Sequence, residues 1–281
     1  MLLIGEIKME YKRILTIQDV SCVGQCSLTV ALPIISACGI ETAILPAAIL
    51  STHTCGFSGY TCRDLTDDIP SIRKHWQKEN LLFDGIYTGY LASAKQIEYV
   101  EDVMKTCLAS DAPKIVDPAM ADNGKLYPAF DADFVDAMRD LCSQADVILP
   151  NITEACFLTG EEYKETYDQK YVDRLLQKLT DIGAKAVVLT GVSYEPSTTG
   201  VVVYQDRKTA YYRHKKLDRS CHGTGDVFAS AFVGAYMQGN SLYDCAKIAA
   251  DFTVECITET PPSHWYGVCF ERCIPSLIEE L

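Results

Sequence analysis

The sequence predicts an α/β fold: a three-layer sandwich whose central sheet is mainly parallel and is flanked by helices. Two observations carry this prediction. From residue 84 to residue 190, short apolar stretches of strand length alternate with longer stretches of helix length, and this repetition is typical of a parallel sheet covered on both faces. In addition, 48% of the 281 residues are hydrophobic, which is enough to fill one large core.

The chain begins with a predicted buried strand at residues 13–18, RILTIQ. A helix is expected over 27–39, with Ser27 as its N-cap and Gly39 at its end. Pro33 is expected to kink this helix or to shift its start, because proline lacks the N–H group that a helix interior needs.

A second apolar run covers 42–50, and it is followed by the glycine- and threonine-rich segment 51–62, STHTCGFSGYTC. Such a composition predicts a loop, and we take it as a candidate lid. The alternation then continues with helices predicted at 66–79, 93–108, 131–142 and 168–182, and strands at 84–88, 114–117, 146–149 and 185–190.

The carboxyl-terminal part predicts an antiparallel hairpin from 200–206 and 209–214, whose basic residues suit a solvated sheet edge. Helices are expected near 224–238 and 241–258, and a last helix ends the chain. Because no linker, repeat or low-complexity segment interrupts the pattern, we expect one domain over residues 1–281.

The formal net charge is −13. A nucleic-acid partner is not expected, because binding a phosphate backbone requires an excess of Lys and Arg over a broad face. No apolar run approaches the roughly 20 residues of a membrane span. The thirteen cysteines show no Cys-x-x-Cys pair or zinc spacing, and the first ten residues lack a secretory pattern. These features predict a cytoplasmic protein with reduced thiols.

The segment His222-Gly-Thr-Gly-Asp226 is the strongest local signal for chemistry. Gly223 and Gly225 allow a tight turn before an apolar helix, so the N–H groups around Thr224 would form an anion-binding helix start. Asp226 stands beside this cradle and is placed to accept a proton from an attacking hydroxyl group. The simpler interpretation is an ordinary helix start with loop glycines and a capping aspartate.

Further polar residues are expected at the carboxyl ends of other strands, where open α/β sheets bind ligands. Asn151 and Glu154 share one face of a helix start and can orient Mg²⁺ or its waters, although they also fit a capping box. Asp117 ends the strand KIVD. The other polar groups predicted near this edge are Asp122, Tyr127 and Thr190.

The opposing wall is predicted from Gln18-Asp19 at the end of the first strand and from Gly89-Tyr90. Tyr90 can stack on a flat ring, although a tyrosine is more often a core residue. His53 is expected to be a lid or structural residue rather than a base, because Asp226 is better placed. There is no Gly-x-x-x-x-Gly-Lys-Ser/Thr motif, so a P-loop enzyme is not expected.

Taken together and in order, these segments resemble the pyridoxal kinase branch of the ribokinase-like superfamily. The similarity spans nearly the whole chain and does not depend on any single motif. The resembling stretches are ILTIQ at 14–18, STHT at 51–54, TGYLASAKQ at 88–96, VDPAM at 116–120, ILPNITEACFLTG at 148–160, VLTG at 188–191 and HGTGD at 222–226.

The resemblance implies ATP and Mg²⁺ as cofactors, often a monovalent cation such as K⁺ or Na⁺, and commonly a homodimer. Its catalytic aspartate matches Asp226. Nucleotide contacts would map onto Asp117, Asp122, Tyr127, Asn151, Glu154 and Thr190. Asp117 and Glu154 would also serve the metal, and the vitamer side would be formed by Asp19, Thr54, Tyr90 and Asp226.

Two positions depart from the pattern of these relatives. Asp19 stands where many of them have a serine that contacts the pyridine ring, and Ala121 stands where a glycine is common. An aspartate at this place would favour a positively charged aminomethyl group, and therefore pyridoxamine.

The predicted activity is ATP-dependent phosphorylation of the 5′-hydroxymethyl group of a B6 vitamer. Three alternatives remain open. A hydroxymethylpyrimidine kinase would share the fold, but a cysteine is common there at the position of Asp226. A sugar kinase would show an amino-terminal double glycine, which is missing. A protein that binds the vitamer without turnover would show affinity without consuming ATP.

Overall fold

The computed structural model describes residues 11–219 and 221–281. The first half contains β1 (Arg13–Ser21), α1 (Leu28–Ala37), β2 (Glu41–Leu50), β3 (Cys62–Asp64), the 3₁₀ turn η1 (Thr66–Asp68), α2 (Ile69–Lys78), β4 (Gly85–Thr88), α3 (Ala94–Thr106), β5 (Lys114–Val116), β6 (Ala121–Asp122), β7 (Lys125–Leu126) and α4 (Ala132–Ser143). The second half contains β8 (Val147–Ile148), α5 (Ile152–Thr159), α6 (Gln169–Asp181), β9 (Ala186–Val192), β10 (Thr198–Gln205), β11 (Lys208–Lys215), α7 (Thr224–Met237), α8 (Leu242–Glu259) and α9 (Ile274–Glu279).

One sheet of nine strands organises the molecule, in the order β11-β10-β9-β8-β5-β4-β1-β2-β3. From β2 to β9 every neighbouring pair is parallel. The two edges are antiparallel, with β3 paired to β2 and the hairpin β10–β11 added beyond β9. The mainly parallel sheet and the hairpin at one edge are therefore confirmed.

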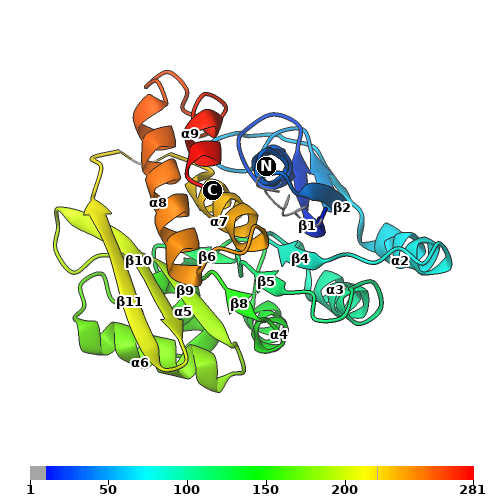
Figure 1. The fold of residues 1–281 in the computed structure, drawn as a ribbon, viewed down its shortest axis with the longest axis horizontal. Helices are drawn as coiled ribbons and strands as arrows, with labels where there is room; N and C mark the ends of the chain where they lie inside the picture. Colours follow the sequence, from blue (N-terminus) through cyan, green and yellow to red (C-terminus); the bar gives the residue numbers. More distant parts are fainter. Residues whose placement is uncertain (1–10, 220) are drawn as a thin grey trace, which may run out of the picture.

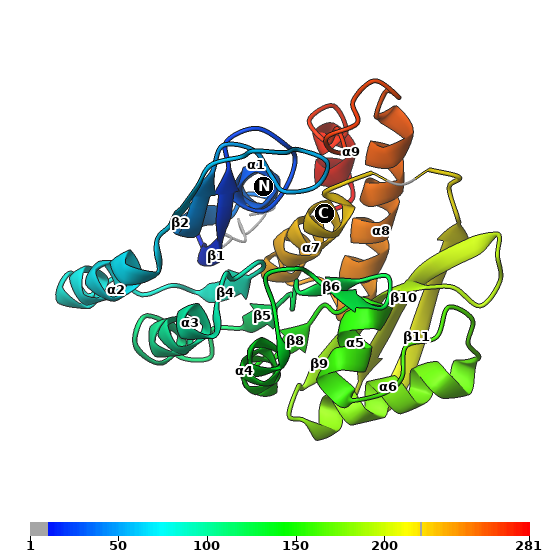
Figure 2. The same cartoon turned by 180° about the vertical axis from the view of Figure 1, so that it is seen from behind.

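The helices form a layer on each face of the sheet (Figure 1). Side chains of α3, α4, α5 and α6 build one apolar core with the strands, and side chains of α1, α7 and α8 build the other. Figure 2 shows α2 at the far end of the molecule from the β10–β11 hairpin. The predicted three-layer α/β sandwich is confirmed.

The two faces are covered by helices of different character. On α6, Val172, Leu175, Leu176 and Leu179 are all fully buried on one face, as their 3.6-residue spacing predicts. By contrast, α7 is buried around most of its surface, because it is packed between α1 and α8. A Cβ atom on Gly234 would lie 2.3 Å from the Sγ of Cys38, so glycine lets α1 and α7 approach closely.

Several boundaries differ from the prediction. β1 continues to Ser21, so Gln18 and Asp19 lie inside the strand and not at its end. The Asp19 and Ser21 side chains are buried there and form a hydrogen bond with each other. β9 likewise extends to Val192, which places Thr190 inside it. The helix α1 begins at Leu28 and contains Pro33 without a shifted start.

Short strands were missed by the sequence analysis. β3 begins at Cys62, the last residue of the expected loop 51–62, and β6 and β7 form a separate two-stranded hairpin. Like β5 and β8, these strands have only two or three residues and cannot show a period-2 pattern. They also contain exposed polar residues, so no apolar run marks them either.

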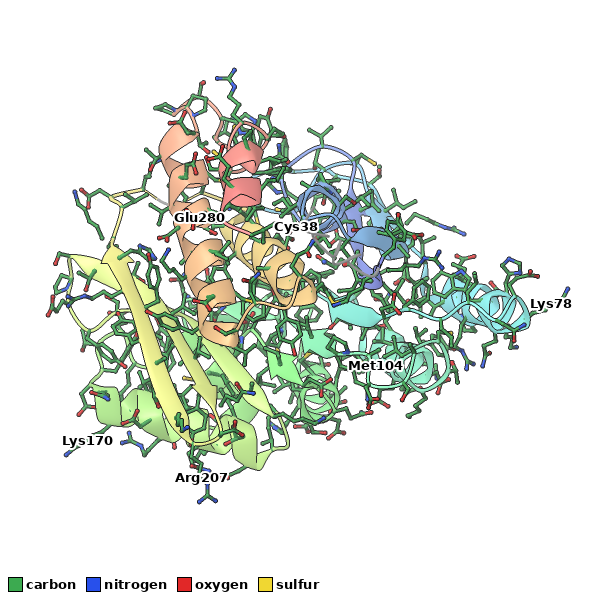
Figure 3. The ribbon with its side chains drawn as sticks, in the orientation of Figure 1. Cys38, Lys78, Met104, Lys170, Arg207 and Glu280 are labelled. Carbon is green, nitrogen blue, oxygen red and sulfur yellow. The ribbon has the colours of Figure 1, made fainter. Side chains whose placement is uncertain are left out.

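The cysteines are free thiols. Within residues 11–219 and 221–281, no helix combines the length and the apolar character that crossing a bilayer requires. Arg207, at the tip of the β10–β11 hairpin, points away from the body of the molecule (Figure 3), as expected for a solvated edge.

Candidate active site

The carboxyl ends of the parallel strands bring most of the predicted residues to one edge of the sheet. Asp19 lies near the end of β1, and short segments after β4, β5 and β8 carry the next ones. The helix α7 places a further carboxylate at the same edge. The residues at this edge are Asp19, Tyr90, Asp117, Asn151, Glu154, Thr190 and Asp226.

Gly223 makes the tight turn that starts α7. Its φ of 81° lies in the left-handed region, and a Cβ atom there would be only 1.8 Å from the carbonyl oxygen of Gln25. Only glycine permits both features. The following Thr224, Gly225 and Asp226 form the first turn of α7, where backbone N–H groups have no partner within the helix and the dipole favours an anion.

Asp226 is a half-buried carboxylate in this first turn. Burial raises its pKa to about 7; the charge of Asp19 also raises it, and the N–H of Ser27 lowers it. A carboxyl group with a pKa near neutrality is suited to take up a proton during a reaction at physiological pH.

Ser27 is a site residue that the sequence analysis assigned only as a helix cap. It caps α1 by position, but its side chain makes no capping hydrogen bond, and its φ is 55°. Its hydroxyl group instead lowers the pKa of Asp19, and its N–H group lowers that of Asp226. The left-handed backbone that allows both contacts has no signal in the sequence CVGQCS.

Asp19 is nearly enclosed, with 5% of its surface exposed. The Ser21 hydroxyl donates a 3.1 Å hydrogen bond to its Oδ2 atom, and burial raises its pKa. Its charge acts on Tyr90 and Asp226, so the three side chains share one environment. In the described part of the chain, no ion pair with Lys or Arg neutralises Asp19 or Asp226.

The candidate lid 51–62 packs against the loop that precedes α9. His53 is buried; its Nε2 atom contacts the carbonyl oxygen of Tyr266, and its Nδ1 atom accepts the N–H of Cys55. The Phe57 ring lies 4.8 Å from that of Trp265. These contacts bear out the interpretation of His53 as structural, while Thr54 of the same segment is exposed.

Tyr90 follows β4 and lies partly buried, with its ring 5.4 Å from that of Phe130. Burial raises its pKa to about 12, so the hydroxyl group stays protonated at neutral pH. The residue therefore contributes both to the core and to the surroundings of Asp19.

Asp117 and Glu154 form a carboxylate pair at the edge, in addition to Asp19 and Asp226. Burial raises the pKa of Glu154 to about 8, although three backbone N–H groups counteract it. The pKa of Asp117 is raised by burial and by the charges of Glu154 and Asp226. No group of three or more potential ligands among the described residues is arranged to hold a metal unaided. Two neighbouring carboxylates do fit Mg²⁺ that arrives with phosphates, because Mg²⁺ is usually held by one or two carboxylates and phosphate oxygens.

Asn151 and Glu154 form a complete capping box at the start of α5. The Asn151 Oδ1 atom accepts the N–H of Glu154 at 2.9 Å, and its Nδ2 donates to the carbonyl oxygen of Ala121 at 2.9 Å. The capping-box interpretation is thus confirmed, because both polar ends of the Asn151 side chain bind protein groups. Its contact with a nucleotide stays a prediction.

The remaining predicted nucleotide residues lie around this pair. Asp122 is exposed and accepts hydrogen bonds from Asn123. Tyr127 is 37% exposed, and its N–H donates to the carbonyl oxygen of Met120. Thr190 donates through N–H and hydroxyl to the carbonyl oxygen of Pro150.

Solved structures resemble this chain along nearly its whole length. A protein of Bacteroides thetaiotaomicron, assigned provisionally as a phosphomethylpyrimidine kinase and crystallised with pyridoxal, is 37% identical with a TM-score of 0.89, covering 95% of this chain and 96% of that one. A pyridoxal kinase of Lactobacillus plantarum is 31% identical with a TM-score of 0.89, covering 96% and 98%.

Sequence relatives include kinases of both substrate types. A hydroxymethylpyrimidine/phosphomethylpyrimidine kinase of Aquifex aeolicus is 26% identical over 64% of this chain and 69% of its own. A pyridoxal kinase of Dictyostelium discoideum is 26% identical over 79% and 77%. The family model for phosphomethylpyrimidine kinase matches residues 46–267. The chain therefore belongs to the phosphomethylpyrimidine kinase family of phosphotransferases, as a pyridoxal kinase-like member of the ribokinase-like superfamily.

Proposed function

We propose that this protein transfers the γ-phosphoryl group of ATP to the 5′-hydroxymethyl group of a B6 vitamer. The observation that carries the proposal is the placement of Asp226, a carboxyl group with a pKa of about 7 in the first turn of α7. The choice of a B6 vitamer as substrate is supported by the two solved relatives described above, one a pyridoxal kinase and the other crystallised with pyridoxal.

In this mechanism the hydroxyl oxygen of the vitamer attacks the γ-phosphorus, and the bond between phosphorus and the β,γ-bridging oxygen breaks. Asp226 takes the hydroxyl proton, and ADP leaves with the electron pair of the broken bond. The N–H groups of Thr224, Gly225 and Asp226 bind the transferring phosphoryl group, with Gly223 supplying the turn.

Asp117 and Glu154 would hold Mg²⁺ on the nucleotide side. When bound there, the metal supplies positive charge that neutralises the phosphate oxygens. The fit comes from the chemistry of the site: the charge of Glu154 raises the pKa of Asp117, and neither carboxylate forms an ion pair with a Lys or Arg among the described residues.

On the vitamer side we place Asp19, Thr54 and Tyr90. The flat Tyr90 ring suits an aromatic substrate. Asp19 is buried and forms no ion pair with a Lys or Arg in the described chain, so it would favour a substrate that carries positive charge next to it. This supports pyridoxamine, whose aminomethyl group is protonated at neutral pH. Closure of segment 51–62 would exclude water from the γ-phosphate.

Hydroxymethylpyrimidine kinase activity is the second candidate. It is favoured by the name of the matching family model and by the Aquifex aeolicus relative. Both substrates present a hydroxymethyl group on a flat heterocycle, so the phosphoryl-transfer machinery described above would serve either.

Initial rates with Mg-ATP and pyridoxal, pyridoxamine, pyridoxine or hydroxymethylpyrimidine test the proposal directly. We expect at least one B6 vitamer to be phosphorylated at a rate well above that of hydroxymethylpyrimidine. A higher rate with the pyrimidine would assign the second activity, whereas vitamer affinity without ATP consumption would indicate a binding protein.

A further inference from the structure

Four loops meet at the amino-terminal end of α7, and a glycine lies at each of their closest contacts. They are the connecting loop 22–27 between β1 and α1, the candidate lid 51–62, the base turn 222–226, which carries Asp226, and the bridging segment 264–268 before α9. Glycine has no Cβ atom, so it lets two stretches of chain approach more closely than any other residue does.

The connecting loop contacts both the candidate lid and the base turn. A Cβ atom on Gly24 would lie 2.1 Å from the Cδ2 atom of His53, so the buried lid histidine packs directly on this glycine. At the next residue, the carbonyl oxygen of Gln25 lies against Gly223, where a Cβ atom would be only 1.8 Å away. Two adjacent residues of one loop therefore hold the candidate lid and the base turn.

The bridging segment contacts the candidate lid through its main chain and through a side chain. The carbonyl oxygen of Tyr266 lies 2.5 Å from the Nε2 atom of His53. The Trp265 ring covers Gly56, where a Cβ atom would lie 2.9 Å from the ring, and its centroid is 4.8 Å from that of the Phe57 ring. Aromatic rings at this separation attract each other beyond the effect of burial alone.

The same segment also contacts the connecting loop and the base turn. A Cβ atom on Gly267 would lie 2.6 Å from the Cβ atom of Gln25. One residue further, the N–H of Val268 donates to the carbonyl oxygen of His222 at 3.0 Å. The Nδ1 atom of His264 lies 2.7 Å from the carbonyl oxygen of Gly267 and closes the segment into a turn. Five consecutive residues thus bridge the candidate lid and the base turn.

We infer that residues 264–268 couple the position of the candidate lid to the placement of Asp226, with Trp265 and Gly267 as positioning residues. The physical basis is close packing: contacts this tight leave no space for one loop to shift without displacing its neighbours. Asp226 is then correctly placed only while the lid covers the site and keeps water from the γ-phosphate. This inference rests on the proposed role of Asp226 as the base.

The principal test is Gly267→Ala. Gly267 does not have a positive φ, so an alanine is strained there only by its contact with Gln25. The added methyl group displaces the bridging segment, and amide hydrogen exchange reports which loops follow it. The reporters are the N–H groups of Ser51 and Thr61 within the candidate lid, and that of Val227, which donates to the base turn at 3.0 Å.

We expect all three amides to exchange about fivefold faster or more, because overpacking a close contact changes an equilibrium constant by at least that factor. In kinetics with Mg-ATP and the vitamer, kcat should fall about fivefold, and a larger share of the ATP should be hydrolysed without transfer. Faster exchange confined to Val268 would overturn the coupling. An unchanged kcat despite faster exchange at Val227 would overturn the role in placing the base.

Trp265→Leu tests the same coupling from the lid side. Trp265 is 53% exposed, so its replacement does not disturb a buried core. Loss of the aromatic contact with Phe57 should accelerate exchange at Ser51 and Thr61 about twofold to tenfold. Coupling predicts that Val227 follows, although the Trp265 side chain packs on the lid. Faster exchange in the candidate lid alone would contradict the inference.

Gly200→Ala is the matched control. Gly200 lies in the β10–β11 hairpin, also without a positive φ, and a Cβ atom there would be 2.0 Å from the carbonyl oxygen of Tyr212. This substitution should lower the melting temperature and leave both kcat and exchange at the reporter amides unchanged. Absence of vitamer turnover in the wild type would count against the proposed function alone, because the exchange measurements do not require turnover.

Discussion

Two carboxylates at the same edge of the sheet, Asp226 and Glu154, have similar proton affinities but differ in their exposure and in their hydrogen-bond partners. Burial raises the pKa of the first to about 7 and of the second to about 8. Glu154 is 3% exposed, and both its oxygens accept backbone N–H groups. Asp226 is half-buried, and only the Ser27 N–H lowers its pKa.

The difference shows that a raised pKa does not by itself mark a catalytic base. A carboxylate whose oxygens are both bound to backbone donors supports the loop that supplies those donors. A carboxylate with free acceptor capacity and access to substrate is available for proton transfer. Substitutions that keep the shape and remove the charge separate the two roles.

The largest effect is expected for Asp226→Asn. Loss of the base should lower kcat by about 10²–10⁴, the usual scale for general-base catalysis, with little change in the KM for ATP. Steady-state kinetics with the preferred vitamer measure this. Near-normal turnover would show that Asp226 is not the base and that the two carboxylates do not differ in role as argued above.

Glu154→Gln should lower stability and, because Glu154 is one of the two carboxylates proposed to hold Mg²⁺, should weaken Mg-ATP binding while leaving the base Asp226 in place. The new amide group presents a donor where Asn151 or Met120 requires an acceptor, so one buried N–H group loses its partner, at a cost of about 1–3 kcal/mol. Denaturant unfolding measures the change, with the exposed Glu165→Gln as control. Unaltered stability would mean that Glu154 is held less firmly than its hydrogen bonds indicate.

Asp19 extends the comparison to a carboxylate that is buried as deeply as Glu154 but lies on the vitamer side. We expect Asp19→Ser to lower the ratio of kcat/KM for pyridoxamine to that for pyridoxal by about tenfold, because a charge-assisted hydrogen bond to the aminomethyl group is lost. Paired rate measurements on both vitamers give the ratio. If the ratio of the two kcat/KM values is unchanged, Asp19 does not determine which vitamer is preferred.

The smallest effect is a pH dependence of stability. Because the pKa of Asp226 is raised to about 7 in the folded protein and is about 3.9 in an unfolded chain, folding favours its protonated form. The contribution is complete below about pH 4 and is lost as the pH rises through 7. Wild type should therefore lose stability relative to Asp226→Asn between pH 4 and 8.

Unfolding curves of both proteins across this pH range provide the measurement. The same ionisation should limit catalysis, so kcat/KM should rise with pH through about 7. Parallel stability curves for the two proteins would show that Asp226 titrates at an ordinary carboxylate pKa.

The fold was largely predictable because its signals are local and repeated. The spacing of Val172, Leu175, Leu176 and Leu179 marks α6, and the turn residues 206–208 mark the hairpin. The edge of the sheet follows from parallel strands, which is why Asp117 and Asp226 were placed together correctly. The predicted end of β1 came too early, because Asp19 and Ser21 are polar but are buried and hydrogen-bonded to each other inside the strand.

The contacts that tune the site were not predictable, because they join residues far apart in the chain. Ser27 reaches Asp226 only through a left-handed backbone. Tyr87 has no distinguishing sequence signal, and only the pairing of β4 with β1 places it opposite Thr16 and brings its hydroxyl group near Gln18. No local pattern encodes these neighbours, since each depends on which strand lies next to which.

The close approach of Gly223 to Gln25 has a consequence for protein synthesis. The turn that presents Asp226 packs against the loop at Gln25, which the ribosome synthesises roughly 200 residues earlier. At about 5–20 residues per second, the ribosome releases these two segments roughly 10–40 s apart. During that interval the amino-terminal strands and α1 exist without α7, so the proposed base Asp226 cannot be presented at the site until α7 has been made.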